Sequence, residues 1–188
     1  MRSVPWSRPR RFRNPLGAIV TLLAIAALAV LVGLLQPPAP RLEGAARAVD
    51  GDTLRLGDAR IRLTGLDAVE LEQHCTDRAG AGWACGKAAR DFLASAVGEG
   101  KTLCRSEGRD RYGRTLARCS VGGDDLGDAI VRAGWATADL DYGLALAEAR
   151  LKGRGIWAGS FDDPAEWRQR HGGESFDFWG WLRGWFAP

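Results

Sequence analysis

Carboxylates and arginines cluster in three short runs of this 188-residue chain. The runs are residues 49–53 (VDGDT), 62–70 (RLTGLDAVE) and 110–114 (DRYGR). Carboxylate oxygens are the ligands that hard cations such as Ca²⁺ prefer. Arginine guanidinium groups pair with phosphate oxygens and stabilise the negative charge that develops in a transition state. Together the three runs contain the groups needed to hydrolyse a phosphodiester.

The acidic residues of the first two runs are predicted to converge. Asp52 follows a tight Asp-Gly turn, and Asp67 ends the third strand of a predicted meander, where the chain can return to the start of the second strand. By itself an Asp-Gly-Asp segment is typical of a hairpin turn, and the spacing of an EF-hand is absent. Glu70 lies three residues beyond Asp67, where it could accept a proton from an attacking water.

Two arginines lie on predicted strands next to these carboxylates. Arg62 belongs to an alternating strand, and Arg114 opens the strand that follows the turn at 110–113. A strand arginine is ordinarily exposed and has no catalytic role. Two guanidinium groups directed at one phosphate would instead bind its oxygens bidentately and neutralise its charge.

The elements that must position these residues indicate a mainly β fold with helices. Alternation of apolar and polar residues predicts three strands over residues 45–66 and a second hairpin over 102–106 and 114–121. Apolar residues at helical spacing predict three helices, over residues 87–97, 125–133 and 144–151. This order suits a five-stranded, partly open β-barrel of the OB type with about three packed helices, an α+β fold.

The N-terminus is predicted to be a single transmembrane helix. Residues 1–14 form a basic flank with five arginines and no acid, and residues 15–36 carry no charge. About 20 apolar residues suffice to cross a bilayer, and the positive flank favours a cytoplasmic N-terminus with the rest periplasmic or extracellular. A cleaved signal peptide has the same order of segments, and it would make the protein secreted.

The remaining chain is predicted to form a linker, one domain and a tail. Residues 37–42 are the proline-rich linker, 43–158 the barrel domain, and 159–188 an aromatic tail. The tryptophans of the tail could lie at a membrane interface, or they could cover apolar surface of the domain or of a partner.

The net charge of +3 comes from the N-terminal flank. Five of the 26 lysines and arginines lie in residues 1–14, which leaves 21 against 23 acidic residues in the rest of the chain. A broad basic face for nucleic acid is therefore not supported. If nucleic acid is bound, a few placed arginines must hold it.

The four cysteines are predicted to form two disulfides. Outside the cytoplasm an even number of cysteines indicates disulfide bonds. Cys104 and Cys119 lie symmetrically about a hairpin turn, and Cys75 and Cys85 flank a glycine-rich loop, so we expect the pairs 75–85 and 104–119 among three possible connectivities. A four-thiolate zinc site is the alternative, although the chain has no C-x₂-C pair.

With these three runs in this order, the chain resembles the staphylococcal-nuclease-like (thermonuclease) family over about residues 43–158. The resemblance implies a Ca²⁺-dependent nuclease on an OB-type barrel that cleaves DNA or RNA, single strands preferentially, to 3′-phosphate products. It implies that Asp52, Asp67 and the backbone carbonyl of Ala68 bind Ca²⁺, that Glu70 activates water, and that Arg62 and Arg114 neutralise the phosphate. Tyr112 matches a position near the nucleotide phosphate, and Tyr142 could stack a base.

Two other functions remain possible from the sequence. One is a non-catalytic OB-type module that binds oligonucleotides or proteins, and the other is a structural or assembly protein of the envelope. The presence of all five charged positions favours the enzyme, since a degenerate member of such a fold would be expected to lose the glutamate or an arginine.

Overall fold

The computed structural model describes residues 15–35 and 40–171 and divides the chain into two compact units, residues 1–38 and 39–188. In the first unit a helix forms where the anchor was predicted: α1 spans Pro15–Leu35 and contains no charged residue. The side chains of α1 are described for residues 16–31. Among all the residues that the structure describes, no helix is long and apolar enough to cross a membrane. Membrane anchoring is thus not shown, and the anchor stays a prediction. The basic flank 1–14 and the end of the aromatic tail lie outside the described residues.

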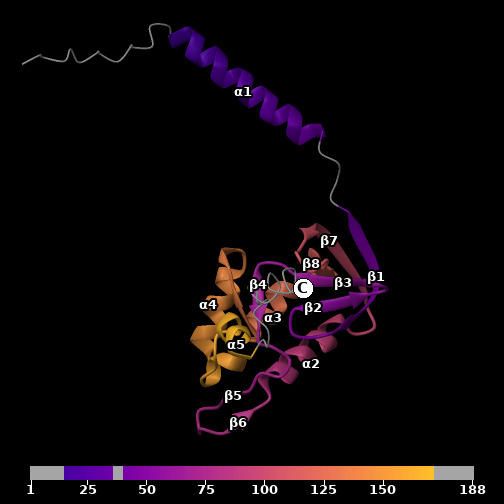
Figure 1. Cartoon of the computed structure of the whole chain (residues 1–188), viewed down its shortest axis with the longest axis vertical. Helices are drawn as coiled ribbons and strands as arrows, with labels where there is room; N and C mark the ends of the chain where they lie inside the picture. Colours follow the sequence, from indigo (N-terminus) through magenta and orange to yellow (C-terminus); the bar gives the residue numbers. More distant parts are fainter. Residues whose placement is uncertain (1–14, 36–39, 172–188) are drawn as a thin grey trace, which may run out of the picture. The chain divides into compact units, whose positions relative to one another are not determined.

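The second unit is built on a closed β-barrel of five strands (Figure 1). The strands are β1 (Arg41–Ala48), β2 (Thr53–Leu56), β3 (Ala59–Leu63), β7 (Lys101–Arg109) and β8 (Thr115–Val121). Neighbours pair antiparallel in the order β3-β2-β1-β7-β8, and β3 also pairs with β8 in parallel. The OB-type prediction is thereby confirmed at the level of the barrel, but the barrel is closed where a partly open one was expected. β1 begins at Arg41, within the predicted linker.

Three helices occupy the predicted positions. They are α2 (Cys85–Val97), α3 (Leu126–Arg132) and α4 (Gly143–Lys152). The side chain of Asp125 caps α3 by accepting a hydrogen bond from the backbone N–H of Asp128 at 2.9 Å. α4 ends at Gly153, whose left-handed backbone (φ 57°) is readily available only to glycine. A fourth helix of this unit, α5 (Pro164–His171), lies in the predicted aromatic tail and was not expected.

Short strands and turns connect the barrel to the helices. β4 (Leu66–Ala68) pairs with β10 (Ala136–Ala138), and α5 contacts β4 on the same side of the unit (Figure 1). The glycine-rich loop between Cys75 and Cys85 contains a small hairpin. The remaining short elements are β5 (Cys75–Thr76), β6 (Gly82–Trp83), β9 (Asp124–Asp125) and the 3₁₀ turns η1 (Leu140–Tyr142) and η2 (Gly155–Ala158).

The hydrophobic core joins the inside of the barrel to one face of α2 and α3. Leu54 and Ile61 from the barrel and Leu93 and Ile130 from the helices are completely buried. Burial of each such side chain stabilises the fold by about 1.5–3 kcal/mol. β2, which follows Asp52, and β3, which carries Arg62, are therefore anchored in the hydrophobic core.

Both predicted disulfides form. Cys75 pairs with Cys85, and Cys104 pairs with Cys119 across β7 and β8, where the two residues are directly opposed. All four cysteines of the chain are thus in disulfides, and the zinc alternative is wrong.

The bridge between Cys104 and Cys119 closes a loop with a sequence separation of 15 residues. We expect the double variant Cys104→Ala/Cys119→Ala to lose about 3 kcal/mol of unfolding free energy, because the unfolded chain regains the freedom that the cross-link removes. Urea denaturation under oxidising conditions measures this loss. An unchanged midpoint would contradict it.

Candidate active site

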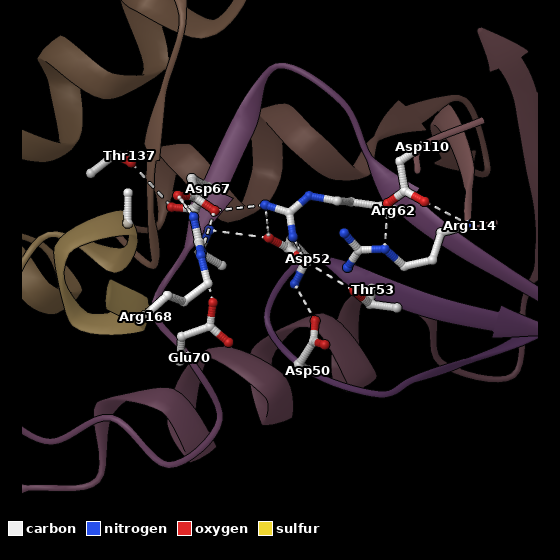
Figure 2. Close-up of polar contacts among 12 residues, drawn as sticks. Asp50, Asp52, Thr53, Arg62, Asp67, Glu70, Asp110, Arg114, Thr137 and Arg168 are labelled. Carbon is white, nitrogen blue, oxygen red and sulfur yellow. Dashed lines mark hydrogen bonds and ion pairs between the residues drawn. The ribbon is translucent and has the colours of Figure 1, made fainter. Parts of the chain in front are cut away.

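The guanidinium group of Arg62 joins the two predicted metal-binding carboxylates (Figure 2). Its Nη2 atom lies 2.9 Å from Asp52 Oδ2 and 2.6 Å from Asp67 Oδ1, and its Nη1 atom donates to Asp52 Oδ1 at 3.2 Å. The convergence of Asp52 and Asp67 predicted from the meander therefore occurs, with Arg62 between them.

Asp52 is almost completely buried, with 5% of its surface exposed. Burial raises the pKa of Asp52 to about 7, while the charge of Arg62 opposes this shift. The carboxylate also accepts hydrogen bonds from Thr53 Oγ1 at 3.0 Å and from the backbone N–H of Ala68 at 3.4 Å. Since an unpaired buried charge is unstable, these donors hold Asp52 where it is.

Backbone pairing fixes the positions of both carboxylates. The carbonyl of Asp52 accepts from the backbone N–H of Leu63 at 2.8 Å, which places the turn beside the end of β3. Gly51 allows the turn to approach β4, because a Cβ atom there would lie 2.7 Å from the Cβ atom of Ala68. On β4 itself, Asp67 is opposite Thr137 of β10.

Glu70 lies just beyond β4 on a loop that is held by Gln73. The buried Gln73 side chain accepts a hydrogen bond from the backbone N–H of Glu70 at 3.0 Å and donates one to the carbonyl of Asp162 at 2.7 Å. Its backbone N–H donates to the carbonyl of Glu70 at 2.8 Å. The disulfide at Cys75 is two residues away. The loop that carries Glu70 is therefore fixed at several points.

Arg114 lines the same pocket as Asp52, Arg62 and Glu70. Its Nε atom donates to Asp110 Oδ2 at 2.7 Å, and Asp110 Oδ1 accepts from the backbone N–H groups of Arg114 and Tyr112 at 2.9 Å. Within the described residues the two Nη groups of Arg114 make no hydrogen bond, so they remain available to a ligand. Tyr112 is 70% exposed, with the guanidinium group of Arg111 4.9 Å from its ring centroid.

Tyr142 does not belong to this site. It is 7% exposed within the hydrophobic core, and its hydroxyl group donates to Asp125 Oδ1 at 3.1 Å. Burial raises the pKa of Tyr142 to about 12. The ring of Tyr142 packs in the core and is therefore not available for the predicted stacking on a base.

One pocket of about 760 Å³ is lined by Asp52, Arg62, Glu70 and Arg114, while Asp67 lines a second pocket together with Arg62 and Arg168. The first pocket contains more guanidinium groups than carboxylates, which suits an anionic ligand although the domain as a whole is slightly acidic. Its charged lining residues are Asp50, Asp52, Asp58, Glu70, Arg60, Arg62, Arg111, Arg114 and Arg168.

Comparison with known proteins identifies the family to which the chain belongs. The family described as staphylococcal nuclease homologue matches residues 60–159, which is more than half of the chain. The chain belongs to this family. The match includes Arg62, Asp67, Glu70 and Arg114, whereas Asp52 precedes it and Arg168 follows it.

Individual relatives of this staphylococcal nuclease homologue have different names. A succinoglycan biosynthesis protein, ExoI, of Rhizobium meliloti is 35% identical over 69% of this chain and 73% of its own length. Protein ParB of Escherichia coli is 33% identical over 79% of this chain and 90% of its own. An uncharacterized endonuclease of Haemophilus influenzae is 29% identical over 64% and 69%. Membership of the family and the endonuclease relative support a nuclease.

Arg168 was not predicted from the sequence. In the structure its guanidinium group contacts the carboxylates of Asp67 and Glu70 (Figure 2). Its Nη1 atom donates to Asp67 Oδ1 at 3.0 Å and to Glu70 Oε1 at 2.7 Å, and its Nη2 atom donates to Asp67 Oδ2 at 2.8 Å. A usable signal was present in the order Asp163, Pro164 and Glu166, since Asp, Pro and Glu favour the N-cap and the first turn of a helix. No signal in the sequence indicates where that helix packs.

The oxygen atoms at this site are of the kind that a hard cation binds. Asp52, Asp67 and the carbonyl of Ala68 are the candidate ligands, and oxygen ligands of this kind, completed by water, are those that Ca²⁺ takes. Among residues 15–35 and 40–171, no three His, Cys, Asp or Glu side chains form a group that could hold a metal ion. The remaining ligands would have to be the carbonyl, water or substrate.

Close packing of Gly86 against the Glu70 loop can be tested. A Cβ atom on Gly86 would lie 1.7 Å from the carbonyl oxygen of Glu70, and backbone cannot yield as a flexible side chain can. We expect Gly86→Ala to cost about 1–3 kcal/mol of unfolding free energy and to displace Glu70. Gly82→Ala is the matched control, because a Cβ atom there meets nothing within 4 Å. Equal denaturation midpoints for the two variants would contradict this packing.

Proposed function

We propose that this staphylococcal nuclease homologue is a Ca²⁺-dependent endonuclease that cleaves DNA or RNA, single strands preferentially, to 3′-phosphate products. The observation that supports it best is the single pocket that contains Asp52, Arg62, Glu70 and Arg114, with Asp67 bound to the same arginine. This pocket joins cation-binding carboxylates to phosphate-binding guanidinium groups, the combination that phosphodiester hydrolysis needs.

Each side chain has a role that follows from its position. Glu70 is a carboxylate at the pocket wall on a fixed loop, and it would accept the proton of the attacking water. Arg114 would bind the phosphate through its two Nη groups, since Asp110 already engages its Nε atom and sets its direction. Arg62 would neutralise charge from the floor of the site, next to Asp52 and Asp67.

Calcium would be held by Asp52, Asp67 and the carbonyl of Ala68. When bound it would supply Lewis acidity and a positive charge for the phosphate oxygens. The exposed Tyr112 would contact the nucleotide beside Arg114, in keeping with its place at the pocket rim. Residues 15–188 contain 21 lysines and arginines against 23 acidic residues, so they do not form a generally basic surface that could hold nucleic acid.

We place the nuclease domain outside the cytoplasm. All four cysteines form disulfides, and such bonds persist in oxidising compartments. In that setting calcium is available and the substrate is nucleic acid outside the cell.

Calcium dependence provides the first test of the function. We expect the full-length chain to cleave single-stranded DNA and RNA with Ca²⁺ and to lose this activity with a chelator, because without the cation the carboxylates of Asp52 and Asp67 would repel the phosphate. Gel analysis of the products, with and without phosphatase, detects cleavage and the 3′-phosphate ends. Undiminished cleavage in chelator would overturn the calcium mechanism, and binding without cleavage would favour an oligonucleotide-binding module.

Substitution of the catalytic candidates provides the second test. Glu70→Gln removes the proton acceptor and Arg114→Ala removes a phosphate ligand, and we expect each to lower kcat/KM by about 10²–10⁴-fold. The matched controls are Glu72→Gln and Arg109→Ala, which alter exposed residues of the same loop and hairpin. Initial rates on one oligonucleotide substrate measure the effects. Wild-type rates in the Glu70 and Arg114 variants would remove the proposed roles.

A further inference from the structure

Arg168 reaches the proposed cation site from a part of the chain that follows the family match. It lies on α5, whose start is held firmly: Pro164 is completely buried, and Gln73 binds the carbonyl of Asp162. Beyond that start, Arg168 joins α5 to Asp67 on β4 and to Glu70 on the loop that follows. The position of the second half of α5 is therefore tied to these ion pairs.

The guanidinium group of Arg168 occupies a lone pair on each oxygen of Asp67, so a cation cannot bind both oxygens of this carboxylate while both arginines are in place. A carboxylate offers about four lone-pair sites. Asp67 Oδ1 accepts from Arg62 and Arg168, and Oδ2 accepts from Arg168. Three of the sites are thus used, two of them by Arg168.

Asp52 has no such reserve. Its Oδ1 atom accepts from Thr53 and from Arg62, and its Oδ2 atom forms an ion pair with Arg62 Nη2 at 2.9 Å and accepts from the backbone N–H of Ala68. All of its roughly four lone-pair sites are engaged. A cation that binds Asp52 must therefore displace one of these donors, and a cation that binds both oxygens of Asp67 must also displace Arg62 or Arg168 from Oδ1.

Of the two arginines that donate to Asp67, Arg168 can leave more easily. Its side chain is 41% exposed on an eight-residue helix, whereas that of Arg62 is 20% exposed on β3, between β2 and β8. Exposed guanidinium groups lose little when water replaces a carboxylate partner. Removal of Arg62 would instead leave the buried carboxylate of Asp52 without its counter-charge.

We propose that Arg168 is an internal competitor for the divalent cation: it sets the calcium affinity of the site, and calcium displaces it from Asp67 and Glu70. The inference rests on the proposed function, because it assumes that Asp67 binds calcium. Displacement also frees the Glu70 carboxylate from its ion pair, so that cation binding and release of the proton acceptor occur together.

Calcium titration of the full-length chain by calorimetry tests the competition. We expect Arg168→Gln to bind Ca²⁺ about five- to tenfold more tightly than the wild type, because the competing donors are lost. Arg168→Lys keeps the charge but not the two-pronged contact, so it should lie between the two. Arg170→Gln is the matched control: it lies on the same helix, pairs with Asp162 at 3.0 Å and should bind Ca²⁺ as the wild type does.

Hydrogen exchange of α5 provides a readout that is independent of activity. Calcium should speed exchange of the amides of residues 165–171 in the wild type, while in Arg168→Gln these amides should exchange fast with or without calcium. Unchanged exchange in α2 would show that both proteins are folded. Equal or weaker Ca²⁺ binding by Arg168→Gln would overturn the inference and leave the nuclease assignment intact. If neither protein binds Ca²⁺, both the competition and the calcium dependence fail, while cleavage in chelator would still reveal a nuclease.

Discussion

The pairing of Arg62 with Asp52 and Asp67 is the interaction on which the site depends. Asp52 is buried next to the core, and a charge in such a place is stable only with a partner that is itself fixed. Arg62 meets this requirement because β3 is hydrogen-bonded on both sides, to β2 and to β8. The same guanidinium group also pairs with Asp67 on β4. The turn at Asp52, strand β3 and strand β4 therefore meet at the side chain of Arg62. The barrel thus contributes charge to the site as well as support, because Arg62 on β3 is the counter-ion of Asp52.

A second set of contacts fixes the side of the pocket that carries Glu70. Gln73 binds the backbone of Glu70 on one side and of Asp162 on the other, and the disulfide between Cys75 and Cys85 ties this loop to the start of α2. A catalytic carboxylate on a loop needs such support, because small displacements from productive geometry are costly.

The sequence predicted the barrel, three helices, both disulfides and the meeting of Asp52 with Asp67, because each of these leaves a local or periodic pattern. It did not predict Arg168, whose partners lie about 100 residues away and whose helix has clear start signals but no apolar face to indicate its packing. The expected base-stacking role of Tyr142 failed for a related reason. A tyrosine suits both a stacking surface and a core, and only the contacts with Asp125 and the surrounding core distinguish the two.

The parallel pairing of β3 with β8 has a consequence for how this molecule acquires its chemistry. The register places Ile61 opposite Thr115, so the strand of Arg62 and the strand that follows Arg114 become neighbours through this ladder. Contacts between segments so far apart in the sequence form late and slowly during folding, since a long loop must close before they stabilise anything. A chain with an open barrel keeps the two arginines apart. Catalytic competence should therefore arrive together with topological closure, which leaves nascent or partly unfolded molecules inert.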